Sequence, residues 1–300
     1  MTRFTGVYTI MPTPFRDDGE LDLPSLERLT DFLVGLGVDG VVVLGVMGEA
    51  PKLGEEEQAQ VIRTTVAAAA GRIPVFAGSG AAGTELAIRK SRRAIELGAA
   101  GLLVAPPPVQ NDAVILEYYR RVGAAAERPL ILHDYPAATG ITMSPELVAR
   151  LHQEVAEVEV IKLEELPSGP KVSAIRKLGS PISIVGGLGG MFFLEELERG
   201  SDGMMTGFSF PELLASIFRA YVQGNRVECR RLFYDACPLL RWEFQPGIGL
   251  ALRKEIYRRR GAIASAFVRH PGTQIDDSLR AELDNVIDYC GLSGSLSVAA

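Results

Sequence analysis

Eight short β-rich runs alternate with eight helical patterns along the chain, and this alternation constrains the fold more than any other feature. Short apolar runs with many β-branched residues are typical of strands in a parallel sheet that is covered on both faces. Eight strand–helix units of this length predict a closed (β/α)₈ TIM barrel. The predicted strands span residues 6–10, 40–44, 74–77, 101–104, 130–133, 158–162, 182–185 and 203–206.

Helical patterns fill the intervals between these runs and continue beyond the last of them. The barrel helices are predicted over residues 23–36, 55–70, 84–97, 112–126, 144–155, 171–178, 191–198 and 211–223. Three more helices, over 226–242, 247–260 and 276–289, exceed what a barrel needs and predict a C-terminal helical appendage. The expected division is therefore a barrel in residues 1–224 and a C-terminal helical region in residues 225–300.

Composition excludes several classes of function. A net charge of −6 without a basic cluster argues against a nucleic-acid partner. No apolar run is long enough to span a bilayer, and the N-terminus lacks the apolar core of a signal peptide, so we expect a cytoplasmic protein with no membrane partner. The three cysteines have no zinc-ligand spacing and are expected to be reduced and packed: Cys229, Cys237 and Cys290.

Lys162 is the first candidate for chemistry, because it ends the apolar run Val158–Lys162. Burial of an ammonium lowers its pKa and makes the amine a nucleophile, which is the condition for an imine with a carbonyl substrate. The alternative is a strand-end lysine whose amine reaches water. The other five lysines lie in polar or helical sequence and are interpreted as solvated surface cations: Lys52, Lys90, Lys171, Lys177 and Lys254.

Chemistry in such a barrel lies at the carboxyl ends of the strands. His133 ends the fifth strand, next to the strand of Lys162, and its imidazole could move protons there, although a hydrogen-bonded core histidine is an equally good interpretation. The glycine-flanked turn after the second strand could hold a carboxylate through the backbone N–H groups of Val46 and Met47. The histidines lie too far apart in the pattern for a metal site, and no dinucleotide fingerprint is present, so no metal and no cofactor are predicted.

These residues resemble the pyruvate-dependent class I aldolases and dehydratases typified by dihydrodipicolinate synthase and N-acetylneuraminate lyase. The likeness covers essentially the whole chain and rests on Gly6-Val7, Thr13-Pro14-Phe15, Gly45-x-x-Gly48-Glu49, Pro136 with Thr139-Gly140, Lys162, and Gly203 to Gly207. It implies the same barrel with a C-terminal helical appendage. It also implies that Lys162 forms an imine with pyruvate or another 2-keto acid, whose carboxylate the turn holds.

The chain departs from dihydrodipicolinate synthases at their proton relay. Val46-Met47 replaces their Thr-Thr, a proline run 106–108 replaces their fourth-strand tyrosine, and His133 replaces the tyrosine of the fifth strand. Their arginine for a second substrate carboxylate is Ala138 here. Because a missing partner for a buried charge is costly, synthesis of dihydrodipicolinate is not expected.

A closer likeness is to 2-keto-3-deoxy sugar acid dehydratases such as the 2-keto-3-deoxyarabonate type. It rests on the residues of strand five, on Lys162-x-Glu164, and on Glu195-Glu196-Leu197-x-Arg199-Gly200-x-x-Gly203. We therefore predict a lyase in which Lys162 is the nucleophile and His133 shuttles protons, with Glu164 a weaker candidate. The predicted substrate-binding residues are Gly45, Val46, Met47, Gly48, Thr13, Met205 and Gly187, and Ser209 is a further small polar residue at the rim.

Two alternatives stay open on the sequence. One is a pyruvate aldolase that condenses with another, apolar or aromatic aldehyde, because the valine, methionine and prolines make a less polar pocket. The other is a barrel that binds 2-keto acids without catalysis. The family resemblance also implies a homodimer or homotetramer.

Overall fold

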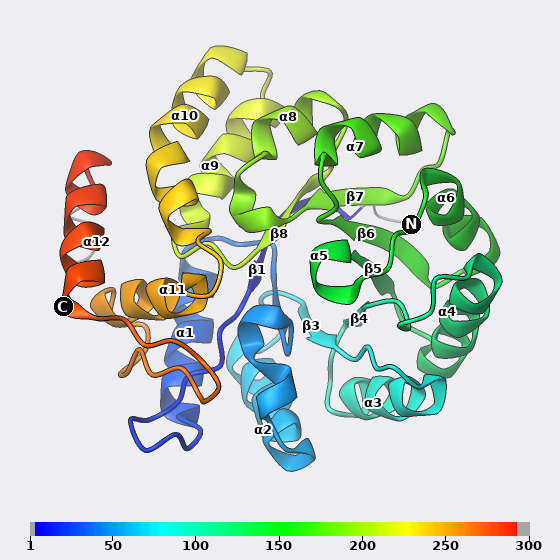
Figure 1. The fold of residues 1–300 in the computed structure, drawn as a ribbon, viewed down its shortest axis with the longest axis horizontal. Coiled ribbons are helices and arrows are strands. Elements are labelled where there is room, and N and C mark those ends of the chain that lie inside the picture. The colour runs from blue at the N-terminus through cyan, green and yellow to red at the C-terminus, as the bar shows by residue number, and fades with distance from the viewer. Residues whose placement is uncertain (1–3, 293–300) are drawn as a thin grey trace.

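The strands form a closed parallel barrel in chain order, as the alternation predicted (Figure 1). The computed structural model describes residues 4–292, and all statements below concern these residues. The predicted strand ends are correct to within one residue. The strands are β1 (Gly6–Ile10), β2 (Gly40–Val43), β3 (Val75–Gly78), β4 (Gly101–Val104), β5 (Leu130–Asp134), β6 (Val158–Leu163), β7 (Ser183–Gly186) and β8 (Gly203–Thr206).

The predicted barrel helices are all present in the described chain. They are α1 (Leu23–Gly35), α2 (Glu55–Ala69), α3 (Thr84–Glu96), α4 (Asp112–Ala126), α6 (Pro145–Glu154), α7 (Ser168–Lys177), α8 (Phe193–Glu198) and α9 (Pro211–Val222). Helix α7 begins at Ser168, three residues before the predicted start at Lys171, and so includes Pro170. Pro170 lies in the first turn, where a backbone N–H has no partner to lose, so the helix tolerates it.

Four short helical turns were not predicted. They are η1 (Val46–Gly48), η2 (Ala50–Lys52), α5 (Pro136–Thr139) and η3 (Leu188–Gly190). Each follows a strand at the carboxyl end of the barrel, and each is too short to show a helical period in the sequence. They form the loops in which the site lies.

The core has an inner and an outer part. The side chains that fill the barrel interior come from alternate positions of the strands and form one apolar cluster: Tyr8, Ile10, Val42, Phe76, Leu103, Ile131, Val160, Val185 and Met205. The opposite strand faces pack against the surrounding helices. Because the lower interior is filled with packed side chains, a substrate has room only at the ends of the barrel.

The C-terminal helices are α10 (Arg226–Glu243), α11 (Gly249–Arg259) and α12 (Asp277–Tyr289). Their apolar side chains join those of α8, α9 and β8 in one cluster, so this region shares a core with the barrel. Figure 1 shows α10 beside α9, with α11 and the segment before it reaching toward the barrel opening. No helix within residues 4–292 is long and apolar enough to cross a membrane.

Candidate active site

Lys162 and His133 meet at the carboxyl ends of β6 and β5. The parallel register places the two residues opposite one another, so their side chains emerge on the same face of the sheet. Both are buried, and Lys162 Nζ lies 3.2 Å from His133 Nε2. The strand order therefore brings together the two residues that the sequence predicted as catalytic.

Glu164 joins this pair and has more contacts than either partner. Lys162 Nζ donates to Glu164 Oε2 at 2.5 Å, and His133 Nε2 lies 2.8 Å from the same oxygen. The other oxygen, Oε1, accepts from the Leu188 N–H at 2.9 Å. A Cβ at Gly187 would come within 2.4 Å of the Glu164 side chain, so only glycine fits there. Glu164 is therefore held at the centre of the cluster, although the sequence indicated it only as a weaker candidate than Lys162 and His133.

Electrostatics assign the charges in this cluster. Burial alone would raise the pKa of Glu164, but the Lys162 charge and the hydrogen bonds from His133 and Lys162 hold it well below its usual range. Burial and the Lys162 charge lower the pKa of His133, and Glu164 opposes this shift. The cluster at neutral pH therefore holds a carboxylate and a neutral imidazole that can accept a proton.

The predicted carboxylate-binding turn is η1, after β2. Val46 and Met47 are the first residues of this turn, so their N–H groups have no earlier turn of helix to bond. Leu44 and Glu49, which flank Gly45–Gly48, have φ of 58° and 53°, a conformation that costs energy for non-glycine residues. Strained residues of this kind cluster where a ligand must be held, and here they bracket the exposed amides.

Glu49 anchors this turn to the C-terminal helices. Its side chain is buried and accepts from Lys254 Nζ at 2.5 Å and from Lys52 Nζ at 2.8 Å. The prediction that all lysines other than Lys162 are solvated is therefore wrong for Lys254, which is fully buried, and also for Lys171, which is bonded to Asp134 and Glu165. Both ammonium groups lie in helical sequence, where a lysine paired by a distant carboxylate has no local signal.

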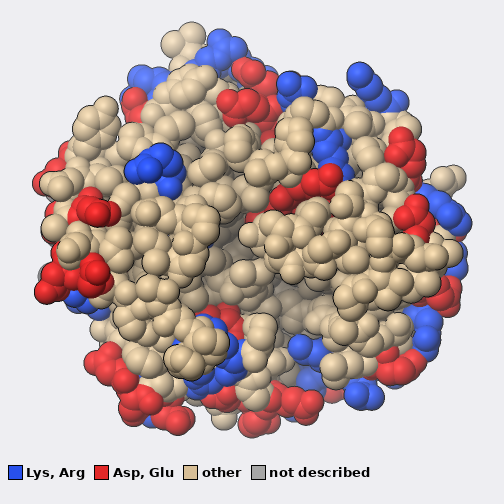
Figure 2. Space-filling model, viewed as in Figure 1, with Lys and Arg blue, Asp and Glu red and all other residues tan. Residues whose placement is uncertain are grey.

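Two cavities open at the carboxyl end of the barrel and meet at Val46 and Leu250. One, of about 820 Å³, is lined by Glu164, by α5 and by the start of α11. The other, of about 660 Å³, includes His133 and the residues around Gly45. Figure 2 shows this face hollowed beside α5, with mostly uncharged side chains at the rim. The Lys162 cluster lies between two spaces large enough for a small substrate.

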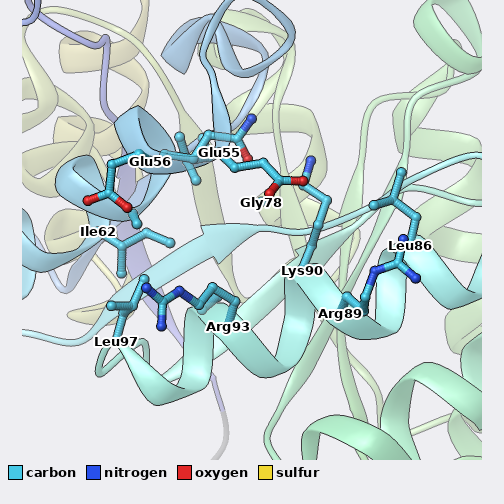
Figure 3. Close-up of a pocket in the computed structure, with 13 residues that line it drawn as sticks. Glu55, Glu56, Ile62, Gly78, Leu86, Arg89, Lys90, Arg93 and Leu97 are labelled. Atoms are coloured by element: carbon cyan, nitrogen blue, oxygen red, sulfur yellow. The ribbon is translucent and has the colours of Figure 1, made fainter.

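A third cavity, of about 390 Å³, lies between α2 and α3 (Figure 3). Lys90 rises from α3 toward Glu55 of α2 and Gly78 of β3, and burial lowers the pKa of this lysine. The cavity adjoins the second one through Leu44 and Gly78 but holds none of the Lys162 cluster.

The predicted substrate-binding residues lie on the cavity walls, behind the turn after β2, or deeper in the barrel. Gly45, Val46 and Met47 line the cavities. Thr13 donates its hydroxyl to the Gly48 carbonyl at 2.7 Å and supports the turn from behind. The remaining two are Gly187, which lies against the Glu164 side chain, and Met205, which lies deeper in the packed barrel interior. Ser209 was expected at the rim, and this is wrong, because it is fully buried and its N–H donates to Glu243.

The structure also shows residues that the sequence analysis missed. Tyr135 stacks on His133 and lines the larger cavity, and Arg253 reaches the same cavity from α11. The Pro136 turn signal could have marked the Tyr135 loop, but nothing local in α11 marks Arg253. Within residues 4–292, no group of three or more potential ligand side chains could hold a metal ion.

The sequence is similar to a family profile and to named enzymes over nearly its whole length. The profile of the dihydrodipicolinate synthetase family matches residues 3–289. An L-2-keto-3-deoxyarabonate dehydratase of Azospirillum brasilense is 32% identical over 94% of this chain and 93% of its own length. A 4-hydroxy-tetrahydrodipicolinate synthase of Methanosphaerula palustris is also 32% identical, over 95% of this chain and 98% of its own length.

Solved structures agree with the barrel described above. A dihydrodipicolinate synthase from Rhodopseudomonas palustris superposes with a TM-score of 0.91 at 37% identity, covering 95% of this chain and 97% of its own. A prophage protein of the dihydrodipicolinic acid synthase family from E. coli K12, solved in complex with pyruvate, superposes with a TM-score of 0.89 at 25% identity, covering 96% and 99%.

Proposed function

The chain belongs to the dihydrodipicolinate synthetase family, and from this premise we propose that it is a lyase that forms an imine between Lys162 and a 2-keto acid. We propose dehydration of a 2-keto-3-deoxy sugar acid as its reaction. The observation that carries the proposal is the buried amine of Lys162 within 2.5 Å of Glu164 and 3.2 Å of His133. A nucleophile, a base and a group that orients the base stand in contact.

Imine formation begins when the neutral amine of Lys162 adds to the C2 carbonyl of the substrate. His133, a neutral imidazole, accepts the proton that the ammonium must lose, and Glu164 stabilises the imidazolium that results. The imidazolium of His133 returns the proton to the hydroxyl group of the adduct, which leaves as water, so a protonated imine remains at C2 and His133 is neutral again. The fixed carboxylate of Glu164 then lies beside the new positive charge.

Elimination follows from the same groups. Removal of a proton from C3 by His133 sends the electron pair into the imine and gives an enamine. The enamine expels the C4 hydroxyl group, which takes from His133 the proton removed from C3 and leaves as water, while the double bond between C3 and C4 and the protonated imine form. Hydrolysis of the imine returns the amine of Lys162 and releases the dehydrated 2-keto acid.

The substrate carboxylate is assigned to the N–H groups of Val46 and Met47. Val46 and Met47 are the first two residues of η1, and Val46 lines both cavities while Met47 lines the larger one. Backbone donors of this kind bind an anion without needing a cationic side chain. The assignment leaves the reacting carbons between the turn and His133.

Site chemistry separates the dehydratase from synthesis of dihydrodipicolinate. The relatives of both names are about equally similar to this chain, so identity does not decide between them. His133 stands where those synthases have their relay tyrosine, and Ala138 where they have the arginine for a second carboxylate. Both differences favour the activity of the 2-keto-3-deoxyarabonate relative.

A second candidate function is a pyruvate aldolase that uses an apolar aldehyde. The observation in its favour is the apolar wall of the larger cavity, formed by residues such as Val46, Leu188, Phe244 and Leu250. Steady-state assays of pyruvate consumption with aldehydes of graded polarity separate the two functions. A dehydratase leaves the aldehydes unreacted and releases no pyruvate from a 2-keto-3-deoxy acid.

Assembly and location follow the sequence prediction. We propose a homodimer or homotetramer in the cytoplasm that acts on a small molecule, although a monomeric dihydrodipicolinate synthase variant is also among the similar structures. Light scattering on the purified protein measures its mass directly.

Borohydride trapping with pyruvate tests the proposed function. We expect a mass adduct that peptide mapping assigns to Lys162, that is absent in Lys162→Ala, and that persists in Lys177→Ala, a change of an exposed lysine. If the wild-type protein gives no adduct with pyruvate or another short 2-keto acid, the enzyme proposal is wrong. The binding barrel without an imine then becomes the better description.

A further inference from the structure

Arg253 is a buried cation that the imine chemistry does not use. It lies in the first turns of α11, lines the larger cavity together with Glu164 and Tyr135, and is 6% exposed. Its Nη1 lies 3.1 Å from the sulfur of Met47, so the guanidinium borders the turn assigned to the substrate carboxylate. Glu164, which contacts Lys162, and Arg253 thus line the same cavity.

One nitrogen of the guanidinium, Nε, is held by Glu243, whereas another, Nη2, has no hydrogen-bond partner within the described residues. Nε donates to Glu243 Oε2 at 3.1 Å, and this carboxylate also accepts from the Ser209 N–H at 3.2 Å. Nη2 is buried and has no hydrogen-bond partner within residues 4–292. A Cβ built at Gly189 would stand 3.3 Å from Nη2, so glycine keeps space beside this donor. A buried arginine that lines a cavity and keeps a donor without a partner is a candidate to bind a ligand oxygen.

The charges around the cavity decide what kind of oxygen this is. Glu164, Glu165 and Glu243 line it, and their partners are Lys162, Lys171 and Arg253 in that order. Each cation is matched by at least one carboxylate, and Lys171 also pairs with Asp134. No surplus positive charge is left along this wall, so a second substrate carboxylate would face three carboxylates without compensation.

We propose that Arg253 determines specificity by binding the hydroxyl-bearing, uncharged far end of a 2-keto-3-deoxy acid, while Glu243 neutralises the guanidinium and excludes acids with a second carboxylate. This inference rests on the proposed function and adds the class of substrate. Arg253 enters from α11, whereas Ala138 lies on α5 next to Ala137 of the same cavity. The far end of the substrate is thus bound from α11, whereas the arginine of the synthases would lie on α5.

Competition against pyruvate trapping at about pH 8, above the pKa of about 7 that burial gives Glu243, tests this assignment without requiring turnover. The probes are 2-keto-3-deoxyarabonate, which ends in a hydroxymethyl group, and 4-hydroxy-2-ketoglutarate, which has the same chain length and ends in a carboxylate. Both are used as mixtures of C4 epimers. We expect the first to compete at least about tenfold more tightly in the wild type. Arg253→Met should weaken competition by 2-keto-3-deoxyarabonate by about 10- to 100-fold and leave trapping of pyruvate itself within about twofold.

Two further variants serve as controls, one for a general effect of an α11 substitution and one for loss of stability. Arg258→Met changes an arginine of the same helix that pairs with Glu255, outside the cavity, and should leave all values unchanged. Arg253→Met with Glu243→Met removes the buried pair together, so that a fold weakened by an unpaired Glu243 is not mistaken for lost recognition. The double variant should lose the same preference for the hydroxyl-bearing acid.

Three results would overturn the proposal. They are equal or tighter competition by the dicarboxylic acid in the wild type, an unchanged preference in both Arg253 variants, or loss of pyruvate trapping in those variants, which would place Arg253 at the imine end. Failure of the wild type to trap pyruvate at all would overturn the proposed function and this inference with it.

Discussion

At the scale of single residues, the sequence predicts that Lys162 and His133 meet, but it does not predict how Glu164 is held between them. Lys162 and His133 were predictable because the ends of neighbouring parallel strands must meet. The fixed position of Glu164 depends on the Leu188 N–H, which belongs to the loop after β7. Leu188 takes a φ of 49°, and no pattern in the sequence predicts that a leucine is held in this conformation.

Replacement of His133 by glutamine should remove the base and keep a polar side chain beside Glu164. The pKa of His133 is lowered, so the imidazole is neutral at neutral pH, and activity should fall as pH drops through this depressed pKa, below about 6.5. We expect kcat/KM of His133→Gln to be lower by about 10²- to 10⁴-fold, without this acid limb. Measurement of kcat/KM between pH 5 and 8, with His152→Gln as control, checks both points. An acid limb that survives in His133→Gln would assign it to another group.

Removal of the Glu164 charge should move the titration of His133. Glu164 raises the pKa of this imidazole through its charge and its hydrogen bond, so Glu164→Gln should lower the pKa further. The NMR shifts of the ring, followed against pH in the wild type and the variant, measure the change without any substrate. A shift to higher pH, or none, would show that Glu164 does not stabilise the imidazolium.

At the scale of elements, the helices and strands were predictable, and the short turns that build the site were not. Alternating apolar runs and capping residues fix the bounds of an element such as α4. Helix α5 has only four residues between Tyr135 and Gly140, which is too few for a period to appear. Helix α11 was predicted, but its contribution of Arg253 and Lys254 to the mouth depends on tertiary packing alone.

Lys254→Met tests how strongly α11 holds the turn after β2. The change leaves the buried carboxylate of Glu49 with only Lys52 and a backbone N–H, so we expect a loss of about 3 to 5 kcal/mol in the free energy of unfolding by urea. Adding Glu49→Gln should recover part of this loss, because the stranded charge is removed. Lys177→Met, on an exposed lysine, serves as control. Equal stability of Lys254→Met and the wild type would contradict the anchoring role.

At the scale of the whole molecule, buried acids make stability depend on pH. Glu196 of α8 is 1% exposed, and neither carboxyl oxygen has a hydrogen-bond partner within the described chain. Burial, reinforced by the negative charge of Glu164, raises the pKa of Glu196 to about 8. Burial likewise raises the pKa of Glu243 to about 7, against the opposing charge of Arg253, so most Glu243 is ionised and neutralises Arg253 only above this pH. The folded protein therefore keeps protons that the unfolded chain releases.

Glu196→Gln should accordingly stabilise the protein at high pH. The contribution of a group with a raised folded pKa is complete below its unfolded pKa near 4.5 and is lost as pH rises through about 8. We expect the variant to gain roughly 3 to 5 kcal/mol over the wild type between pH 5 and pH 9. Urea unfolding at both pH values measures the gain, with the exposed neighbour in Glu195→Gln as control. If the difference in free energy of unfolding between the variant and the wild type does not change with pH, Glu196 is ionised in the folded protein.

The ion pair between Glu49 and Lys254 joins groups that lie 205 residues apart in the chain. During synthesis, the ribosome therefore makes Lys162 and the turn after β2 long before it makes α11, the helix that anchors this turn through Lys254. A nascent chain that stops within the barrel has its nucleophile but lacks the fastening and the guanidinium beside it. If Lys162 forms the proposed imine, we expect full reactivity toward 2-keto acids only after α11 has left the exit tunnel and docked.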